Sequence, residues 1–255
     1  MKKALLIAGA VVFLALLAAL LYPRSDTGSA LRLYSGAGLR RAVDELCSRF
    51  EAETGIRVEP DYGGSGMIIS RARADKEADL FLPGDVWYVD RLEQLSGKVE
   101  KRAEVACFVP TIIVARGNPR KVKSLACFAR KDLKVGLGKS DACQIGRVSA
   151  KLLSAAGVKR SELEVQESLT VNELGIWVKM KAIDAAIVWD AIAANLTADV
   201  DTVPIPREQN LISRVVLARL KSSAHPEAAD RFLEFVSGPR GREILKSKGF
   251  RVEAP

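Results

Sequence analysis

The sequence predicts an α/β protein with two doubly wound lobes, and three features of its pattern support this fold class. After residue 30, the order strand, loop, helix occurs three times, over residues 31–50, 56–75 and 78–95. A long apolar segment at 107–115 leads away from this part of the chain, and an alternating segment at 211–220 leads back. Repeated strand–helix units are typical of a parallel sheet covered by helices, and two crossings of the chain then separate two lobes.

The first unit opens with a strand at 31–35 and a glycine loop at 36–38. The helix that follows has an apolar face and ends at Gly55, because glycine commonly follows the last helical residue. That face consists of Leu39, Val43, Leu46 and Phe50. Residues three or four positions apart lie on one side of a helix, so this side is predicted to pack on the sheet.

The second and third units have their loops at the same edge of the sheet. They comprise a strand at 56–60 with a helix at 67–75, and a strand at 78–82 with a helix at 86–95. Glycine-containing loops at 62–66 and 83–85 join each strand to its helix. In doubly wound sheets, ligands bind outside the carboxyl ends of the strands. The loops of all three units therefore mark the expected site.

The second lobe is expected to repeat this plan. Its elements are strands at 135–138, 163–167 and 185–189, and helices at 146–156 and 172–181. Two terminal helices, at 225–236 and 239–248, follow the returning segment.

The lobes are therefore expected to be discontinuous in sequence. Residues 31–107 and 209–255 form the first lobe, and residues 108–208 form the second. The hinge is expected near 107–110 and 209–213, where the chain crosses between them.

The first thirty residues are set apart from this fold. Lys2 and Lys3 precede an unbroken apolar run at 4–21, and a basic start before an apolar run is typical of an export signal. The run also approaches the length that spans a bilayer. Residues 1–30 are expected to be a signal peptide or a membrane anchor, with the rest of the chain outside the cytoplasm. The first cysteine is Cys47, which disfavours a lipid anchor on cysteine.

Composition excludes several kinds of site. His225 is the single histidine of the 255 residues, so histidine-rich metal sites and histidine-based catalysis are not expected. The net charge of +8 suits an anionic ligand, an anionic lipid surface or simple solubility. No basic run with interleaved aromatic residues occurs, so nucleic acid is not an expected partner. We expect a monomer that catalyses no reaction.

The cysteines leave the redox state open. They are Cys47, Cys107, Cys127 and Cys143. An even number in an exported chain permits disulfides, and Cys127 with Cys143 is the pair to test first because a short strand separates them. Buried thiols that pack as small apolar side chains are the alternative.

Two nucleotide-binding motifs are matched only in part. Residues 136–140 end like a phosphate-binding loop, but that loop requires glycine where Leu133 stands. Residues 36–38 begin like a dinucleotide-binding fingerprint, whose third glycine would fall on Arg41. Neither kind of nucleotide site is expected.

Loops of small residues that open helices indicate an anion site. They lie at 35–38, 63–66, 142–146 and 170–172. The first N–H groups of a helix are unpaired and carry the positive end of its dipole, so they bind an anion without a charged side chain. Each loop alone is consistent with an ordinary helix cap, but their joint position at strand ends favours an anion.

Acidic residues and one tryptophan lie near these loops. The acidic residues are Asp79, Asp85, Asp141 and Asp190. They are expected to cap helices, with binding of a cation as the alternative. Trp189 ends a buried strand, where it is either a core residue or a donor to a ligand through its indole N–H.

The order of these motifs resembles that of the periplasmic molybdate-binding proteins. Residues 31–85 contain Leu-Tyr-Ser-Gly-Ala-Gly-Leu, Tyr-Gly-Gly-Ser-Gly and Ala-Asp-Leu-Phe-Leu-Pro-Gly-Asp in that order. Further matches lie at 112–119, 135–138 and 185–191, so the resemblance covers nearly all of the chain from 31 to 250. It implies a type II periplasmic-binding-protein fold, with molybdate or tungstate held between the lobes by neutral donors.

The resemblance also implies a partner and a location. Proteins of this family deliver their anion to the permease of an ABC importer, at the periplasmic or outer face of the cytoplasmic membrane. The bound oxyanion is the ligand, and neither a cofactor nor a metal is expected.

Ser65 is the strongest ligand candidate that the resemblance implies. Gly64 and Gly66 flank it and offer backbone N–H groups. The turn before the third helix is expected to contribute through Gly84, because Pro83 has no N–H.

The chain departs from the family at some of the implied positions. The family's serine before the first helix falls on Gly38, with Ser35 three residues earlier as a substitute. The family's tyrosine hydroxyl falls on Trp189. In the second lobe, Cys143 stands where the family offers a backbone N–H.

Two other functions remain open from the sequence. The same fold can bind sulfate, phosphate or a metal cation, the last held by Asp85, Asp190 and Tyr34. A membrane-tethered sensor domain would keep residues 1–30 and have no transporter partner.

Overall fold

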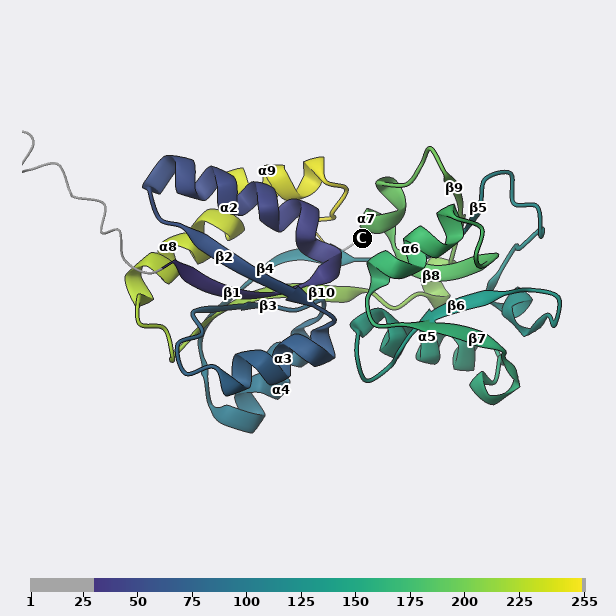
Figure 1. Cartoon of the computed structure of the whole chain (residues 1–255), viewed down its shortest axis with the longest axis horizontal. Helices are drawn as coiled ribbons and strands as arrows, with labels where there is room; N and C mark the ends of the chain where they lie inside the picture. The colour runs from purple at the N-terminus through teal and green to yellow at the C-terminus, as the bar shows by residue number, and fades with distance from the viewer. Residues whose placement is uncertain (1–29, 254–255) are drawn as a thin grey trace, which may run out of the picture.

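The protein consists of two α/β lobes that lie side by side along its long axis (Figure 1). The structure is a computed structural model that describes residues 30–253. The expected signal peptide or anchor at 1–30 therefore lies almost wholly outside the described residues. No described helix is long and apolar enough to cross a membrane.

Lobe 1 is built on a five-stranded mixed sheet with the order β2-β1-β3-β10-β4. Its strands are β1 (Leu31–Gly36), β2 (Val58–Gly63), β3 (Leu80–Leu82), β4 (Val99–Phe108) and β10 (Ser213–Leu220). Strand β1 is parallel to β2 and β3, whereas β10 is antiparallel to β3 and β4. The returning segment is therefore the strand that joins the two parts of this lobe.

Helices cover both faces of this sheet. They are α2 (Arg40–Thr54), α3 (Ser65–Ala74), α4 (Val86–Ser96), α8 (Pro226–Ser237) and α9 (Pro239–Ser247), with a 3-10 turn at Ala37–Leu39 before α2. Figure 1 shows α2, α8 and α9 on one face and α3 and α4 on the other. The predicted apolar face of α2 is confirmed, since all four of its residues are at most 1% exposed. Gly55 follows this helix with a φ of 72°, which favours glycine.

Lobe 2 has a second mixed sheet with the order β7-β6-β8-β5-β9. Its strands are β5 (Pro110–Ala115), β6 (Val135–Gly138), β7 (Val165–Ser168), β8 (Ala185–Trp189) and β9 (Val200–Pro204). Its helices are α5 (Gln144–Ala155), α6 (Val171–Lys179) and α7 (Asp190–Ala194), with 3-10 turns at Leu125–Ala129, Arg160–Glu162 and Arg207–Gln209. The expected fold class, two doubly wound lobes joined by a hinge, is confirmed.

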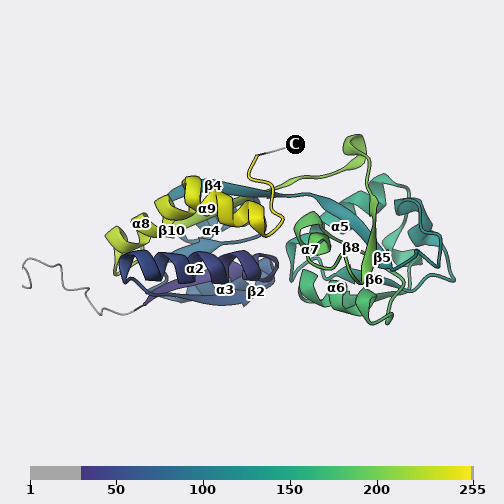
Figure 2. The ribbon, with the colours of Figure 1, turned by 90° about the horizontal axis from the view of Figure 1, so that it is seen from above.

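The chain crosses between the lobes at Val109 and again between β9 and β10 (Figure 2). The single strand expected over 107–115 is in fact two strands in different sheets. The N–H of Val109 donates to the carboxylate of Asp190 over 3.3 Å, and its carbonyl accepts from the Asp190 N–H over 2.8 Å. Because both backbone groups of Val109 bind Asp190, this residue belongs to neither sheet and forms one of the two hinge connections.

The four cysteines are free thiols, all within the described part of the chain. Cys47, Cys107 and Cys143 are buried and Cys127 is half-buried. Cys127 and Cys143 therefore form no disulfide in this structure. The structure instead agrees with the alternative prediction that the cysteines are reduced, and three of them are buried as small apolar side chains.

Candidate functional site

A small pocket lies between the two lobes, at the carboxyl ends of the parallel strands. It is lined by Gly36, Ala37, Gly38, Gly63, Gly64, Ser65, Gly84, Phe108, Cys143, Gln144, Ile145, Thr170, Val171 and Trp189. Its volume is about 20 Å³. Since a single water needs roughly 10–15 Å³ by the same measure, the cavity suits a compact ion and not a sugar or a peptide.

Several helices begin at this pocket, and α3, α5 and α6 are among those that lack a side-chain cap. The N-cap residues of α3, α5 and α6 are Gly64, Cys143 and Thr170, and none of these accepts a hydrogen bond from its helix through its side chain. Helix α4 differs, because the carboxylate of Asp85 accepts from the N–H of Trp87 over 2.8 Å. Uncapped helix starts carry positive partial charge, so the pocket is suited to an anion.

Several backbone N–H groups of pocket-lining residues have no partner. Among them are those of Ser65, Gln144, Ile145 and Val171, and no acceptor within residues 30–253 bonds to any of these four. Buried N–H groups are rarely left without an acceptor, since this costs about 1–3 kcal/mol each. One small ion with several acceptor oxygens would satisfy donors from α3, α5 and α6 together.

Ser65 supplies a hydroxyl at the lobe 1 side of the pocket. Its side chain is buried, and its Oγ accepts a hydrogen bond of 3.0 Å from the Gly84 N–H. This bond orients the hydroxyl and leaves its hydrogen free to be donated. The Gly84 N–H is therefore used within lobe 1, and Ser65 is the group that this pair presents to a ligand.

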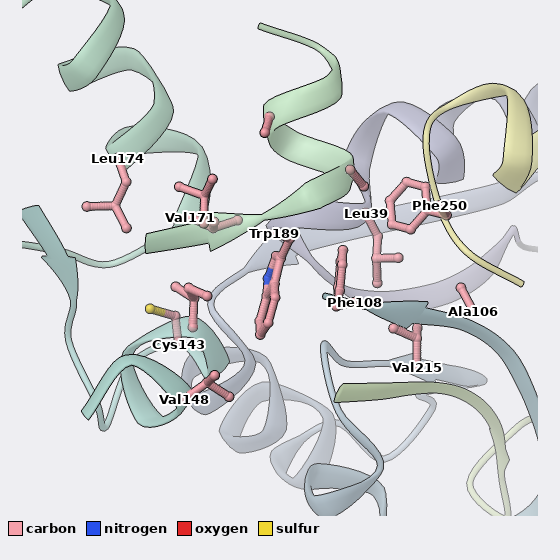
Figure 3. Packing of buried hydrophobic residues seen from close by; sticks show 14 of the residues in the cluster. Leu39, Ala106, Phe108, Cys143, Val148, Val171, Leu174, Trp189, Val215 and Phe250 are labelled. Atoms are coloured by element: carbon pink, nitrogen blue, oxygen red, sulfur yellow. The ribbon is translucent and has the colours of Figure 1, made fainter. Parts of the chain in front are cut away.

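An aromatic pair forms the base of the pocket. The rings of Phe108, at the end of β4, and Trp189, at the end of β8, are stacked with centroids 4.8 Å apart and an interplanar angle of 13°. A Cβ on Gly38 would lie 3.5 Å from Cδ1 of Trp189, so the edge of the indole that carries the N–H adjoins Gly38. Figure 3 shows the indole nitrogen on the side of the ring that faces Cys143 and Val171.

Cys143 lines the pocket as a neutral group. Burial raises the pKa of its thiol to about 11, so the thiolate is absent at neutral pH. Its N–H and its thiol both point to the carbonyl of Lys139, at 3.0 and 3.6 Å. The adjacent Gln144 and Ile145 therefore provide the free N–H groups at the start of α5.

No charged side chain lines the pocket within the described part of the chain. The groups proposed for a cation are engaged elsewhere. Tyr34 donates to Asp75 over 2.9 Å, and Asp190 accepts from Arg251 over 2.8 Å. Residues 30–253 contain no group of three or more His, Cys, Asp or Glu that could hold a metal.

The structure brings together most of the residues that the sequence predicted. Gly38, Gly64, Ser65, Gly84, Cys143 and Trp189 all line the pocket. Ser35 and Gly66 do not. Ser35 is fully buried, with no partner for its Oγ among the described residues. The N–H of Gly66 donates to the carbonyl of Ala142 in the other lobe, over 2.9 Å.

Some pocket residues were not singled out in the sequence. They are Gly36, Ala37, Gly63, Phe108, Gln144, Ile145, Thr170 and Val171. All of them except Phe108 lie in the loops predicted at 35–38, 63–66, 142–146 and 170–172, but a backbone donor has no characteristic residue type. The detectable signal was therefore a loop that opens a helix, and the individual donors within it could not be identified.

With this geometry described, comparison with known proteins identifies the family. Residues 31–251 match the family described as bacterial extracellular solute-binding proteins. The chain belongs to this family. Its members bind solutes, which is a binding function and not a catalytic one.

Individual relatives are more distant. A binding protein of Haemophilus influenzae is 29% identical over 222 residues, covering 86% of this chain and 90% of that protein. A molybdate-binding protein ModA of Mycobacterium bovis is 25% identical over 223 residues, covering 86% and 83%. Among solved structures, the sulfate-binding protein SubI of Mycobacterium tuberculosis superposes with a TM-score of 0.77 at 20% identity, covering 89% and 88%. This last likeness concerns the fold alone.

Proposed function

We propose that this protein binds a tetrahedral oxyanion, molybdate or tungstate, between its lobes and delivers it to the permease of an ABC importer. The observation that carries the proposal is the set of four unpaired N–H groups at Ser65, Gln144, Ile145 and Val171. They come from three uncapped helix starts in both lobes, so an anion that binds them also joins the lobes.

The absence of charged side chains narrows the class of anion. Among the described residues that line the pocket, none is Asp or Glu. Hydrogen phosphate carries a proton that needs an acceptor, and a carboxylate is the usual one. A fully deprotonated dianion needs donors only. The pocket therefore favours molybdate, tungstate or sulfate over phosphate, because the proton of hydrogen phosphate finds no carboxylate to accept it.

The choice of molybdate or tungstate over sulfate rests on the relatives. A molybdate-binding protein is 25% identical to this chain over most of its length. Sulfate is the second candidate, since the fold is shared with a sulfate-binding protein. The family is extracellular, and we place the protein in the periplasm or on the outer face of the cytoplasmic membrane, with the permease as partner and residues 1–30 as export segment.

Titration calorimetry of the full chain in mild detergent tests this proposal. Molybdate, tungstate, sulfate and phosphate are added separately to the wild type, to Ser65→Ala and to the control Ser70→Ala. Ser70 lies on the same helix α3 but is exposed. We expect binding of molybdate and tungstate, weaker sulfate and no phosphate. Ser65→Ala should weaken binding by roughly tenfold or more, the value of a hydrogen bond to a charged group.

Two results would contradict the proposal. Binding of phosphate as tight as that of molybdate would mean that an acceptor for its proton exists in the site. Equal binding by Ser65→Ala and the wild type would mean that the anion lies elsewhere.

A further inference from the structure

A contact outside the pocket joins the two lobes. The guanidinium of Arg147, on α5 in lobe 2, lies over the ring of Trp87, on α4 in lobe 1. Its central carbon is 3.4 Å from the centroid of the Trp87 ring and 5.7 Å from that of Tyr88. The two rings are perpendicular, with centroids 4.9 Å apart. Neither aromatic residue nor Arg147 lines the pocket.

The charge of Arg147 has no carboxylate to pair with. Among the described residues, no ion pair includes this arginine, although its side chain is half-buried. It also lies in the first turn of α5, where the positive end of the helix dipole disfavours a cation. The faces of Trp87 and Tyr88 carry negative partial charge and offset this cost. The guanidinium is therefore stabilised mainly by rings that belong to the opposite lobe.

Both aromatic partners are fixed in lobe 1. Tyr88 is buried, and burial raises the pKa of its phenol to about 12 against the opposing charge of Arg147, so it stays neutral. Trp87 is 41% exposed and follows the capping residue Asp85 by two positions. The backbone N–H of Trp87 donates to that carboxylate, so the backbone at Trp87 is fixed. The outer face of the Trp87 ring remains open to the other lobe.

The contact exists only when the lobes are together. Three hydrogen bonds accompany it across the cleft near the pocket. The Gly66 N–H donates to the Ala142 carbonyl and Asn172 Nδ2 to the Ala37 carbonyl, each over 2.9 Å, and Gln144 Nε2 donates to Ser213 Oγ over 3.1 Å. These bonds border the pocket directly. Arg147 follows the pocket residues Gln144 and Ile145 by three and two positions on α5 and does not line the pocket, so its contact closes the cleft beside the ligand site.

We propose that Arg147 and Trp87 form an inter-lobe latch that slows the release of the bound anion. The inference rests on the proposed function for its effect on a ligand. Because the stack is broken when the lobes separate, its loss accelerates opening and leaves association almost unchanged. An exposed cation–π contact is expected to change the dissociation rate by about two- to fivefold. Arg147 and Trp87 are positioning residues, since neither touches the ligand.

Stopped-flow tryptophan fluorescence with molybdate as the probe measures both rates on the full chain in mild detergent. The variants are Trp87→Ala, Arg147→Met, and both together, with Trp87→Phe as the conservative change. Tyr62→Ala is the matched control, because Arg40 lies 4.0 Å from the Tyr62 ring within lobe 1. This control removes the same kind of contact without any effect on closure.

We expect each latch variant to release molybdate about two- to fivefold faster, with the association rate unchanged. The double variant should be no faster than the single ones, Trp87→Phe should recover part of the retention, and Tyr62→Ala should match the wild type. Unchanged release in both single variants would overturn the latch. A reduced association rate with unchanged release would also overturn it, because Arg147 would then act by attracting the anion.

Small-angle scattering of the ligand-free chain separates this inference from the proposed function. If the wild type binds no oxyanion, the proposed function fails, but the latch still predicts a larger mean radius of gyration in Trp87→Ala and Arg147→Met than in the wild type and Tyr62→Ala. Equal radii in all four proteins would then overturn the latch as well.

Discussion

The two lobes have the same kind of sheet but contribute differently to the pocket. Lobe 1 presents a hydroxyl, that of Ser65, which is oriented by the N–H of Gly84. Lobe 2 presents the free N–H groups of Gln144, Ile145 and Val171 at two uncapped helix starts. In lobe 1 the start of α3 is also uncapped and leaves the N–H of Ser65 free, whereas Asp85 caps α4 with a carboxylate. Of the free N–H groups at Ser65, Gln144, Ile145 and Val171, three therefore belong to lobe 2.

This difference indicates that the two lobes contribute differently to the attraction and the discrimination of anions. Backbone N–H groups at helix starts attract any small anion, because they respond to charge and have no side chain to vary. A single oriented hydroxyl adds a donor at a fixed position, which distinguishes ions by size and protonation. Closure then combines the two. The predictions below test this comparison, starting with the largest expected effect.

Preventing closure should have the largest effect. A Cβ on Gly66 would lie 1.9 Å from the carbonyl oxygen of Asp141 in lobe 2. Gly66→Ala should therefore exclude the closed form and weaken molybdate binding roughly a hundredfold or more, as expected when one of two states is removed. The measurement is titration calorimetry. Thermal unfolding of the same variant should be unchanged or slightly improved, because alanine favours the α3 helix.

Weaker molybdate binding with unchanged thermal stability would show that Gly66→Ala prevents closure of the lobes without impairing folding. If Gly66→Ala binds molybdate like the wild type, the lobes do not meet at this residue when the ligand is bound. Ser70→Ala on the same helix should change neither quantity.

Removing the indole donor should have an intermediate effect. Trp189→Phe keeps a ring to stack on Phe108 and removes the N–H together with one ring of the indole, a loss of volume that the control below shares. The loss of one donor to an anion should weaken molybdate binding by about tenfold, as measured by calorimetry. Trp177→Phe is the matched control, since Trp177 packs against the core and does not line the pocket. Equal affinities for both variants would mean that Trp189 serves only as a core residue.

Alkaline pH should have the smallest effect of these changes on molybdate binding, and its effect is on the free energy of unfolding. Each lobe contains one buried thiol that contributes to it. Burial raises the pKa of Cys47 in lobe 1 to about 12 and that of Cys143 in lobe 2 to about 11. The unfolded thiols ionise near 8.5, so the unfolded state loses protons first as the pH rises. The free energy of unfolding should be unaffected below this value and should fall by about 2 kcal/mol per thiol near pH 10.

Urea unfolding at neutral and alkaline pH measures this change. The fall should be smaller in Cys47→Ala and in Cys143→Ala than in the wild type. Saturating molybdate should protect the wild type at both pH values, since the thiol of Cys143 is neutral in the folded protein over this range. An identical fall in the variants and the wild type would mean that other groups cause the alkaline loss.

Much of the fold was predictable from the sequence because it depends on periodicity. The apolar face of α2, from Leu39 to Phe50, repeats at helical spacing, and its burial followed directly. The break at Val109 was not predictable, because an apolar residue within an apolar run gives no sign of leaving the sheet. Its cause is a distant residue, Asp190, which binds both of its backbone groups.

The site was predictable only where a side chain or a glycine marks it. Ser65 and Gly64 belong to a recognisable loop, and both line the pocket. Gln144, Ile145 and Val171 offer backbone N–H groups to the pocket, so their residue types carry no signal. Gly66 was expected to bind the ligand, but its N–H bonds to Ala142 across the cleft. Sequence reasoning could not separate a glycine that contacts a ligand from one that allows two lobes to meet.

The position of β10 has a consequence for how the chain assembles. This strand lies between β3 and β4, so the sheet of lobe 1 remains in two pieces until residues 213–220 have been made. The sheet of lobe 2, from Pro110 to Pro204, is contiguous in sequence and needs nothing that comes later. Chain segments that must wait for distant partners form their structure slowly. Lobe 2 can therefore fold before the rest of the chain is available, while lobe 1 and the hinge contact between Arg251 and Asp190 are completed last.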